Sequence, residues 1–334
     1  MASRLSWSRR LIFSLIPVAV LFAVIEGGLM AADWPPEPTA PFEHNEPFWT
    51  ADPDLRSEAL PHNEEQTTFP VSTNGDGLRA PLFSVEADPG TLRIMTLGCS
   101  TTFGWGVRDE ETYPARLGGY LAQRGYDSVE VVNGGQPGYT SFQGRWLWDR
   151  VLKDYRPDVV LIGYVVQDAR KASYSDKSQA ILQNDARFLK DNVLYRLRSY
   201  LLLRTALGKV QIRAKERGQG DQGGTHRVPV ADYSENLQYL IDQVEGLGGA
   251  PVLFGYPLER SGYTADHRSI LKAAAQVKGV PLFDPQPQME AATRSQQLYF
   301  PNDRGHANAA GNDLIAQWVA DFLVESGLLG QEGS

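Results

Sequence analysis

The sequence predicts an α/β fold of three layers, in which a parallel β-sheet is covered by helices on both faces. Two observations predict it. Short segments that are apolar throughout, such as Val159–Tyr164, alternate along the chain with amphipathic helical segments. Strands that are buried on both faces are typical of parallel sheets. The chain has 334 residues and is 42% hydrophobic, which suffices for one large folded domain or two small ones.

Each expected strand is a short apolar run. The five runs are Leu92–Leu97, Val129–Val132, Val159–Tyr164, Pro251–Tyr256 and Val280–Asp284. Ligands of such sheets bind beyond the carboxyl ends of the strands. Ser100, Gly135, Gln167 and Tyr256 each come just after or at the end of one of these strands, so we expect them to gather on one edge of the sheet.

Each expected helix carries apolar residues at helical spacing. In Asp232–Gly246, for example, Leu237, Leu240 and Val244 share one face. The full set is Tyr113–Arg124, Phe142–Tyr155, Asp232–Gly246, Asp266–Lys278 and Ala309–Glu325. These helices alternate with the strands, as a sheet covered on both faces requires.

The N-terminus predicts a membrane anchor or a signal segment over residues 1–32. Arg4, Arg9 and Arg10 precede the uncharged run Leu11–Ile25, and the apolar stretch continues to residue 30 with Glu26 inside it. Twenty residues of helix span about 30 Å, enough to cross a bilayer core. We expect a single-pass cell-membrane anchor, with the basic flank cytoplasmic and the remaining chain on the periplasmic or extracellular side. A cleaved signal peptide, leaving a secreted or periplasmic protein, is the alternative.

Three further regions follow the N-terminal segment. Residues 33–70 are rich in Pro, Glu and Asn and predict a linker or a strap on the domain surface. Residues 71–328 form the predicted folded domain, with a helical insertion at about 170–230. The middle of the insertion, Phe188–Arg217, is basic and is expected to be a surface helical hairpin, a lid, or a face resting on anionic lipid.

Composition excludes several classes of protein. The net charge of −8 argues against a general nucleic-acid binder. The single cysteine, Cys99, permits neither an internal disulfide nor a thiol-rich metal site. The sequence has no phosphate-binding loop, nucleotide fingerprint or metal-ligand cluster. We therefore expect no cofactor and no metal.

Two segments far apart in the chain together predict a serine hydrolase. Ser100 follows Gly98 at the end of the first strand, and Asp303 precedes His306 by three positions near the last helix. A serine hydroxyl is a weak nucleophile until a neighbouring base activates it, and that base is commonly oriented by a third group. Cys99 is a possible nucleophile too, but adjacent side chains at a strand end point in different directions.

These segments belong to a wider pattern that resembles the SGNH or GDSL hydrolases over roughly residues 72–328. Four blocks match in order: Gly98-Cys99-Ser100, Asn133-Gly134-Gly135, Gly163 to Gln167-Asp168, and Asp303 to His306. The resemblance implies a flavodoxin-like parallel sheet and a catalytic set of Ser100, Asp303 and His306. It also implies an oxyanion hole formed by Ser100, Gly135 and Gln167.

The chain departs from the family pattern at two positions. Cys99 stands where the family usually has aspartate, and Gln167 stands where asparagine is usual. Glutamine keeps the amide N–H but adds a methylene, so the donor must fold back or sit displaced. Loss of one oxyanion donor costs about 10²–10³ in rate, so a misplaced Gln167 would slow the enzyme without abolishing its activity.

The resemblance implies a carboxylic ester hydrolase of the exported, membrane-linked type. Its substrate would be an ester, possibly an O-acetyl group on a glycan, hydrolysed through an acyl-serine intermediate. Two alternatives stay open. The same triad would serve an O-acyltransferase that acts on a glycan, and the changes at Cys99 and Gln167 are compatible with a non-catalytic glycan-binding module.

Overall fold

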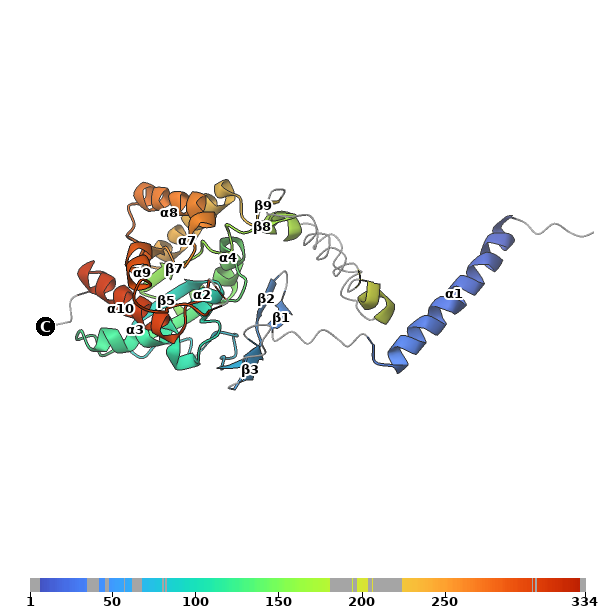
Figure 1. Ribbon diagram of the computed structural model, residues 1–334, viewed down its shortest axis with the longest axis horizontal. Coiled ribbons are helices and arrows are strands. Elements are labelled where there is room, and N and C mark those ends of the chain that lie inside the picture. The colour runs from blue at the N-terminus through green and yellow to red at the C-terminus, as the bar shows by residue number, and fades with distance from the viewer. Residues whose placement is uncertain are drawn as a thin grey trace, which may run out of the picture. The chain divides into compact units, whose positions relative to one another are not determined.

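The computed structural model describes residues 7–34, 42–45, 48–56, 58–61, 68–79, 81, 83–180, 194, 197–203, 206, 224–301, 303 and 305–330. The chain divides into two compact units. One unit combines Met1–Ala40 with Ala180–Gln222, and the other combines Pro41–Gln179 with Gly223–Ser334. The second unit contains the sheet and its helices (Figure 1).

A five-stranded parallel sheet forms the centre of the second unit. Its strands are β5 (Leu92–Gly98), β6 (Val129–Gly135), β7 (Val159–Ile162), β10 (Ala250–Phe254) and β11 (Leu282–Phe283). Their spatial order is β11-β10-β7-β5-β6, and every neighbouring pair is parallel. Counted along the chain, this is the order 2-1-3-4-5 of flavodoxin-like sheets. The predicted fold class is confirmed.

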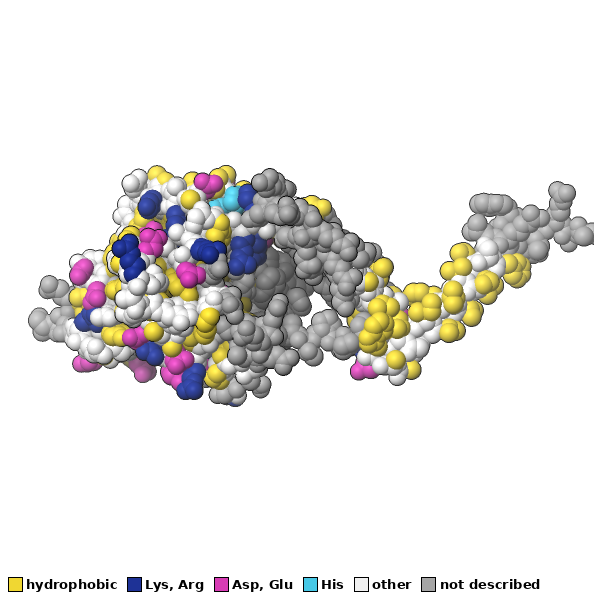
Figure 2. Space-filling model, viewed as in Figure 1, with side chains coloured by type: hydrophobic (Ala, Val, Ile, Leu, Met, Phe, Trp, Pro, Cys, Tyr) yellow, Lys and Arg dark blue, Asp and Glu magenta, His cyan; other side chains and the backbone are white. Residues whose placement is uncertain are grey.

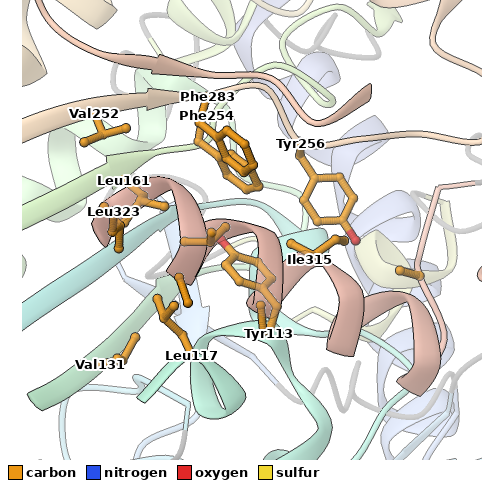
Figure 3. Close-up of a cluster of buried hydrophobic side chains, with 14 of the residues drawn as sticks. Tyr113, Leu117, Val131, Leu161, Val252, Phe254, Tyr256, Phe283, Ile315 and Leu323 are labelled. Atoms are coloured by element: carbon orange, nitrogen blue, oxygen red, sulfur yellow. The ribbon is translucent and has the colours of Figure 1, made fainter. Parts of the chain in front are cut away.

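Helices cover both faces of this sheet (Figure 1). On one face α3 (Tyr113–Ala122) packs against α10 (Ala309–Glu325), and on the other α4 (Ser141–Arg150) packs against α7 (Val230–Gly246), with α8 (Ala265–Lys278) beside α7. Figure 3 shows the core of the first face, where Tyr113, Phe254 and Ile315 lie between sheet and helices. These three side chains are completely buried.

The expected elements agree with the observed ones to within a few residues, with two differences. The helix expected over Phe142–Tyr155 is broken at Val151, where the backbone leaves the helical region (φ −134°), and continues as a 3₁₀ turn, Leu152–Tyr155. A short helix, α9 (Gln286–Ala292), follows β11. Two further 3₁₀ turns are Asp109–Glu111 and Gly262–Thr264.

The segment expected as a linker or strap contains two antiparallel ribbons. β1 (Phe42–Asn45) pairs with β2 (Phe48–Ala51), and β3 (Glu58–Pro61) pairs with β4 (Thr68–Val71). Ala51, Phe69 and Val71 are buried and pack against Phe103. Part of this segment therefore contributes to the core of the second unit.

An apolar helix, α1 (Trp7–Ala31), forms much of the described part of the first unit. Its stretch Phe13–Ala31 has a mean hydropathy of 2.1 and is long enough to cross a membrane or to serve as a signal segment. Most of its side chains are exposed apolar groups (Figure 2). Most of Phe188–Arg217 lies outside the described residues, apart from positions 194, 197–203 and 206.

Glu26 is the exception on α1, because it is only 7% exposed. Its carboxylate accepts hydrogen bonds from the backbone N–H groups of Arg198 and Ser199, at 2.5 and 3.0 Å. The Arg198 guanidinium also donates to Asp33 at 2.7 Å. These bonds satisfy the carboxylate and join the two chain segments of the first unit.

Candidate active site

Ser100 is the first residue of a four-residue helix, α2 (Ser100–Phe103), that begins as soon as β5 ends. The glycines around it leave room for this helix. A Cβ on Gly98 would lie 2.1 Å from Thr102 Oγ1, and one on Gly135 would lie 2.4 Å from the backbone nitrogen of Phe103. Because only glycine permits such close approach, α2 can rest on the ends of β5 and β6.

Ser100, His306 and Asp303 form a continuous hydrogen-bonded chain. The distance between Ser100 Oγ and His306 Nε2 is 2.7 Å, and His306 Nδ1 bonds to Asp303 Oδ2. The second oxygen of Asp303 accepts the backbone N–H groups of Gly305 and His306, at 3.0 and 3.2 Å. The carboxylate accepts a hydrogen bond from the Nδ1–H of His306. The Nε2 atom of neutral His306 therefore carries no proton and can accept one from the serine hydroxyl.

Electrostatics keep Asp303 ionised in this arrangement. Burial by itself would raise its pKa, but the hydrogen bond and the charge of His306, together with the backbone N–H groups of Gly305 and His306, lower that pKa far below its ordinary value. A carboxylate that stays charged can stabilise the imidazolium that forms when the histidine takes a proton. His306 does not cap the last helix, because Asn308 holds that position.

The three expected oxyanion donors are placed differently. Ser100 opens α2, so its N–H has no partner within the helix. Gln167 follows β7 and is half-buried, with its side-chain oxygen bonded to Arg227 Nη1 at 3.3 Å. The N–H of Gly135, by contrast, donates to Asn133 Oδ1 at 3.0 Å. In this structure the Gly135 N–H is thus engaged by a side chain, and the absence of a Cβ on Gly135 leaves room for α2.

Tyr256, which was expected at the sheet edge, and the neighbouring residues Asp168 and Cys99 have other roles. Tyr256 is completely buried in the hydrophobic core. Asp168 is completely buried too, and its Oδ1 accepts the Ser141 backbone N–H at 2.9 Å, which ties the loop after β7 to the start of α4. Cys99 is 2% exposed, and its sulfur lies 3.3 Å from Thr101 Oγ1. Within the described ranges, no cluster of metal-ligating side chains is found.

Two arginines near the site were not assigned to it by the sequence. Arg79 is 1% exposed and donates to the carbonyls of Phe103 and Val107, at 2.8 and 2.6 Å, just beyond the nucleophile. Arg227 donates to Gln167, as described above. No local pattern marks them, because their partners lie far away in the sequence.

Residues 96–314 match the model of the GDSL-like lipase/acylhydrolase family. No curated protein matches the chain. Solved structures with a similar fold include a lipase/acylhydrolase from Enterococcus faecalis, with 16% identity over 73% of this chain and 100% of that one, and a TM-score of 0.49.

Two further structures are similar to the same extent. An acetylxylan esterase from Geobacillus stearothermophilus, solved as a catalytic mutant, has 16% identity over 75% of this chain and 98% of that one, with a TM-score of 0.46. An α/β hydrolase from the metagenome of Lake Arreo has 19% identity over 74% and 99%, with a TM-score of 0.47. Because the family match spans more than half of the sequence, the chain belongs to the GDSL-like lipase/acylhydrolase family and is an ester-hydrolysing enzyme.

Proposed function

We propose that the enzyme cleaves its ester through a covalent acyl-Ser100 intermediate. The hydrogen-bonded chain from Ser100 through His306 to Asp303 is the observation that supports it most directly. His306 Nε2 accepts the hydroxyl proton as Ser100 Oγ attacks the ester carbonyl, and then delivers that proton to the departing alcohol. Water, deprotonated by the same nitrogen, attacks the acyl carbonyl next; the acid is released and the proton returns to Ser100 Oγ.

The oxyanion formed in each step needs preorganised donors. We assign the backbone N–H of Ser100 and the side-chain amide of Gln167 to this role. The loop after β6 supplies another candidate in Gly138, which is half-buried and has a positive φ of 76°. We favour Gly138 over Gly135 for this role, because the Gly135 N–H already donates to Asn133 Oδ1.

We propose a short acyl group, such as an O-acetyl group on a glycan, as the substrate. The nucleophile is only 6% exposed, which favours a small acyl group at the reacting carbon and leaves the larger alcohol side outside.

We also propose that α1 holds the enzyme in the cell membrane with the catalytic unit on the exported side. Its apolar stretch has the length of a single span. The arginines that precede it favour a cytoplasmic N-terminus. N-terminal sequencing of the mature protein tests this: an intact N-terminus is expected, and a start near residue 32 would mean a cleaved signal peptide.

The test of the reaction is turnover of p-nitrophenyl acetate by the full-length protein in detergent micelles. Wild type should turn over, and Ser100→Ala should lower kcat by about 10⁴–10⁶. No turnover by wild type would contradict the proposal and favour a non-catalytic binding module. If an added glycan acceptor becomes acetylated and the release of free acetate falls correspondingly, the enzyme is an O-acyltransferase with the same acyl-serine step.

A further inference from the structure

The insertion after β7 leaves and rejoins the sheet domain through a short ribbon. β8 (Lys171–Ala172) pairs antiparallel with β9 (Thr225–His226). Arg227 follows β9 directly, and its backbone is held on both sides. Its N–H donates to the Arg170 carbonyl at 2.8 Å, and its carbonyl accepts the N–H of Asp176 at 2.7 Å.

The Arg227 guanidinium reaches from this ribbon into the candidate oxyanion region. Its Nη1 donates to the Gly138 carbonyl at 2.7 Å and to Gln167 Oε1 at 3.3 Å. Its Nη2 donates to Gln143 Oε1 at 3.1 Å. The side chain is 18% exposed. Through its bonds to Gly138 and Gln167, this one planar cation joins the loops that follow β6 and β7.

Asp176 fixes the orientation of that cation. Its two oxygens accept Nε and Nη2 of Arg227, at 3.0 and 2.8 Å, which is a bidentate pair. Asp176 Oδ2 also accepts the Thr140 hydroxyl at 2.8 Å, at the N-terminus of α4. The Asp176 side chain is only 7% exposed. A lysine could not reproduce this planar, forked geometry.

The contact with Arg227 sets the orientation of the Gln167 side-chain amide. A glutamine amide presents an acceptor oxygen at one end and an N–H₂ donor at the other, and the two exchange places when the amide flips. A cation beside Oε1 opposes the flip, because the flip would bring N–H₂ against the guanidinium. With Oε1 held by Arg227, the other end of the amide is the donor end.

We propose that Arg227 is a positioning residue that holds Gln167 as an oxyanion donor. The β8–β9 ribbon, which Arg227 follows directly, thereby influences the rate of the chemical step. This rests on the function proposed above. The contact with Arg227 also explains how a glutamine can act as the donor, because it restricts the conformational freedom that the extra methylene adds to the side chain. The same Nη1 fixes the carbonyl of Gly138, so both loops that supply donors are aligned by one side chain.

The test is a double-mutant cycle on the full-length enzyme with p-nitrophenyl acetate. We expect Arg227→Met to lower kcat by about 10–100-fold with KM changed by less than about threefold, and Gln167→Ala to lower kcat by about 10²–10³. In the Gln167→Ala background, Arg227→Met should lower kcat by clearly less than it does in wild type, because the part of the loss that acts through Gln167 is already gone. Arg227→Lys should recover only part of the loss. Lys171→Met, an exposed change in the same ribbon, is the matched control and should leave kcat unchanged.

Each outcome decides between two explanations. Unchanged kcat in Arg227→Met, or losses from Arg227 and Gln167 that multiply in the double variant, would overturn the positioning role. If Arg227→Met does not fold, the cycle is run with Arg227→Lys, and a loss that persists unchanged in the Gln167→Ala background overturns it equally. Inactive wild type would instead contradict the proposed function itself.

Discussion

At the scale of single residues, Cys99 and Ser100 are neighbours with opposite environments. Ser100 Oγ lies 2.7 Å from His306 Nε2, whereas the Cys99 sulfur lies in the hydrophobic core and contacts Thr101. The Cys99 side chain is 2% exposed, and the hydrogen-bond partner of its sulfur is the Thr101 hydroxyl. Cys99 is thus a small core residue that occupies the N-cap of α2 without a side-chain capping bond.

Cys99→Ala should therefore leave the chemistry intact. We expect kcat within about threefold of wild type and a loss of stability of about 1 kcal/mol, because a buried sulfur is removed from the core. The checks are steady-state kinetics and urea unfolding. A fall in kcat as large as that of Ser100→Ala would move the nucleophile to the cysteine.

Asp168 predicts a pH dependence of stability. Burial is the main cause that raises its pKa from 3.8 to about 6, although Ser141 and Arg227 act to lower it. The folded protein then binds more protons at this site than the unfolded chain between about pH 4 and pH 6. The contribution of Asp168 to the free energy of unfolding is fully present below pH 4. It falls by about 3 kcal/mol as the pH rises to 6.

Asp168→Asn should remove that dependence. The free energy of unfolding of the variant, measured in urea at pH 5 and pH 8, should fall less between the two values than that of wild type. Asp149→Asn, an exposed carboxylate at the end of α4 that bonds Tyr239, is the control. Equal slopes for Asp168→Asn and wild type would show that Asp168 does not titrate in this window.

The triad could be predicted from the sequence because its pieces carry local signals: a glycine-bounded serine after an apolar strand, and an aspartate three residues before a histidine. The hydrogen bond from the Gly135 N–H to Asn133 could not be predicted, because the sequence is equally compatible with a bond from that N–H to a substrate. Arg227 was missed because its partners Gly138 and Gln167 come from other loops.

At the scale of elements, the short helix α2 depends on a buried arginine. Arg79 donates to the carbonyls of Phe103 and Val107 and to Asp109 Oδ1, the last at 2.8 Å. These carbonyls lie at and beyond the end of the four-residue helix that starts with Ser100. A helix this short cannot be stable alone, so the arginine bonds contribute to its position.

Arg79→Met should consequently destabilise the fold and displace the nucleophile. We expect a loss of about 3–5 kcal/mol, because buried carbonyls and Asp109 lose their partner. The exposed Arg56, which also donates to a carbonyl, provides the control Arg56→Met, with a loss below about 0.5 kcal/mol. Urea unfolding measures both. Similar losses in the two variants would contradict a special role for Arg79.

The amphipathic helices and the wholly apolar strands were predictable, whereas other short elements were not. Helices such as α7 and α10 repeat the apolar period several times, and the strands are apolar runs between glycine-containing loops. α2 has four residues, too few for any period. The ribbons β1–β2 and β3–β4 have strands of four residues each in a segment rich in polar residues and proline, so composition suggested a linker.

At the scale of the whole molecule, the chain combines a catalytic unit with a unit built on α1. The sequence could identify α1 from its apolar length, but not the grouping of residues 180–222 with it, since that depends on contacts such as those of Glu26. A carboxylate in an apolar helix is costly unless its oxygens are bonded, and the backbone of Arg198 and Ser199 provides those bonds.

Glu26→Ala should loosen the contact within this unit. We expect amide hydrogen exchange at Arg198 and Ser199 to become about tenfold faster in detergent, since each N–H loses a charge-assisted acceptor. Exchange in α10 of the same sample serves as the internal control and should not change. Unaltered protection at the two amides would mean that Glu26 does not hold this segment.

In the proposed reaction Ser100 carries the covalent chemistry, and fragment mass spectrometry of the full-length enzyme after fluorophosphonate treatment identifies the nucleophile. We predict one adduct per chain on Ser100, none in Ser100→Ala, and labelling at least about 10³-fold slower in His306→Ala because the base is gone. An adduct on Cys99 or on any other residue, or an enzyme that turns over ester while Ser100 stays unlabelled, would contradict it.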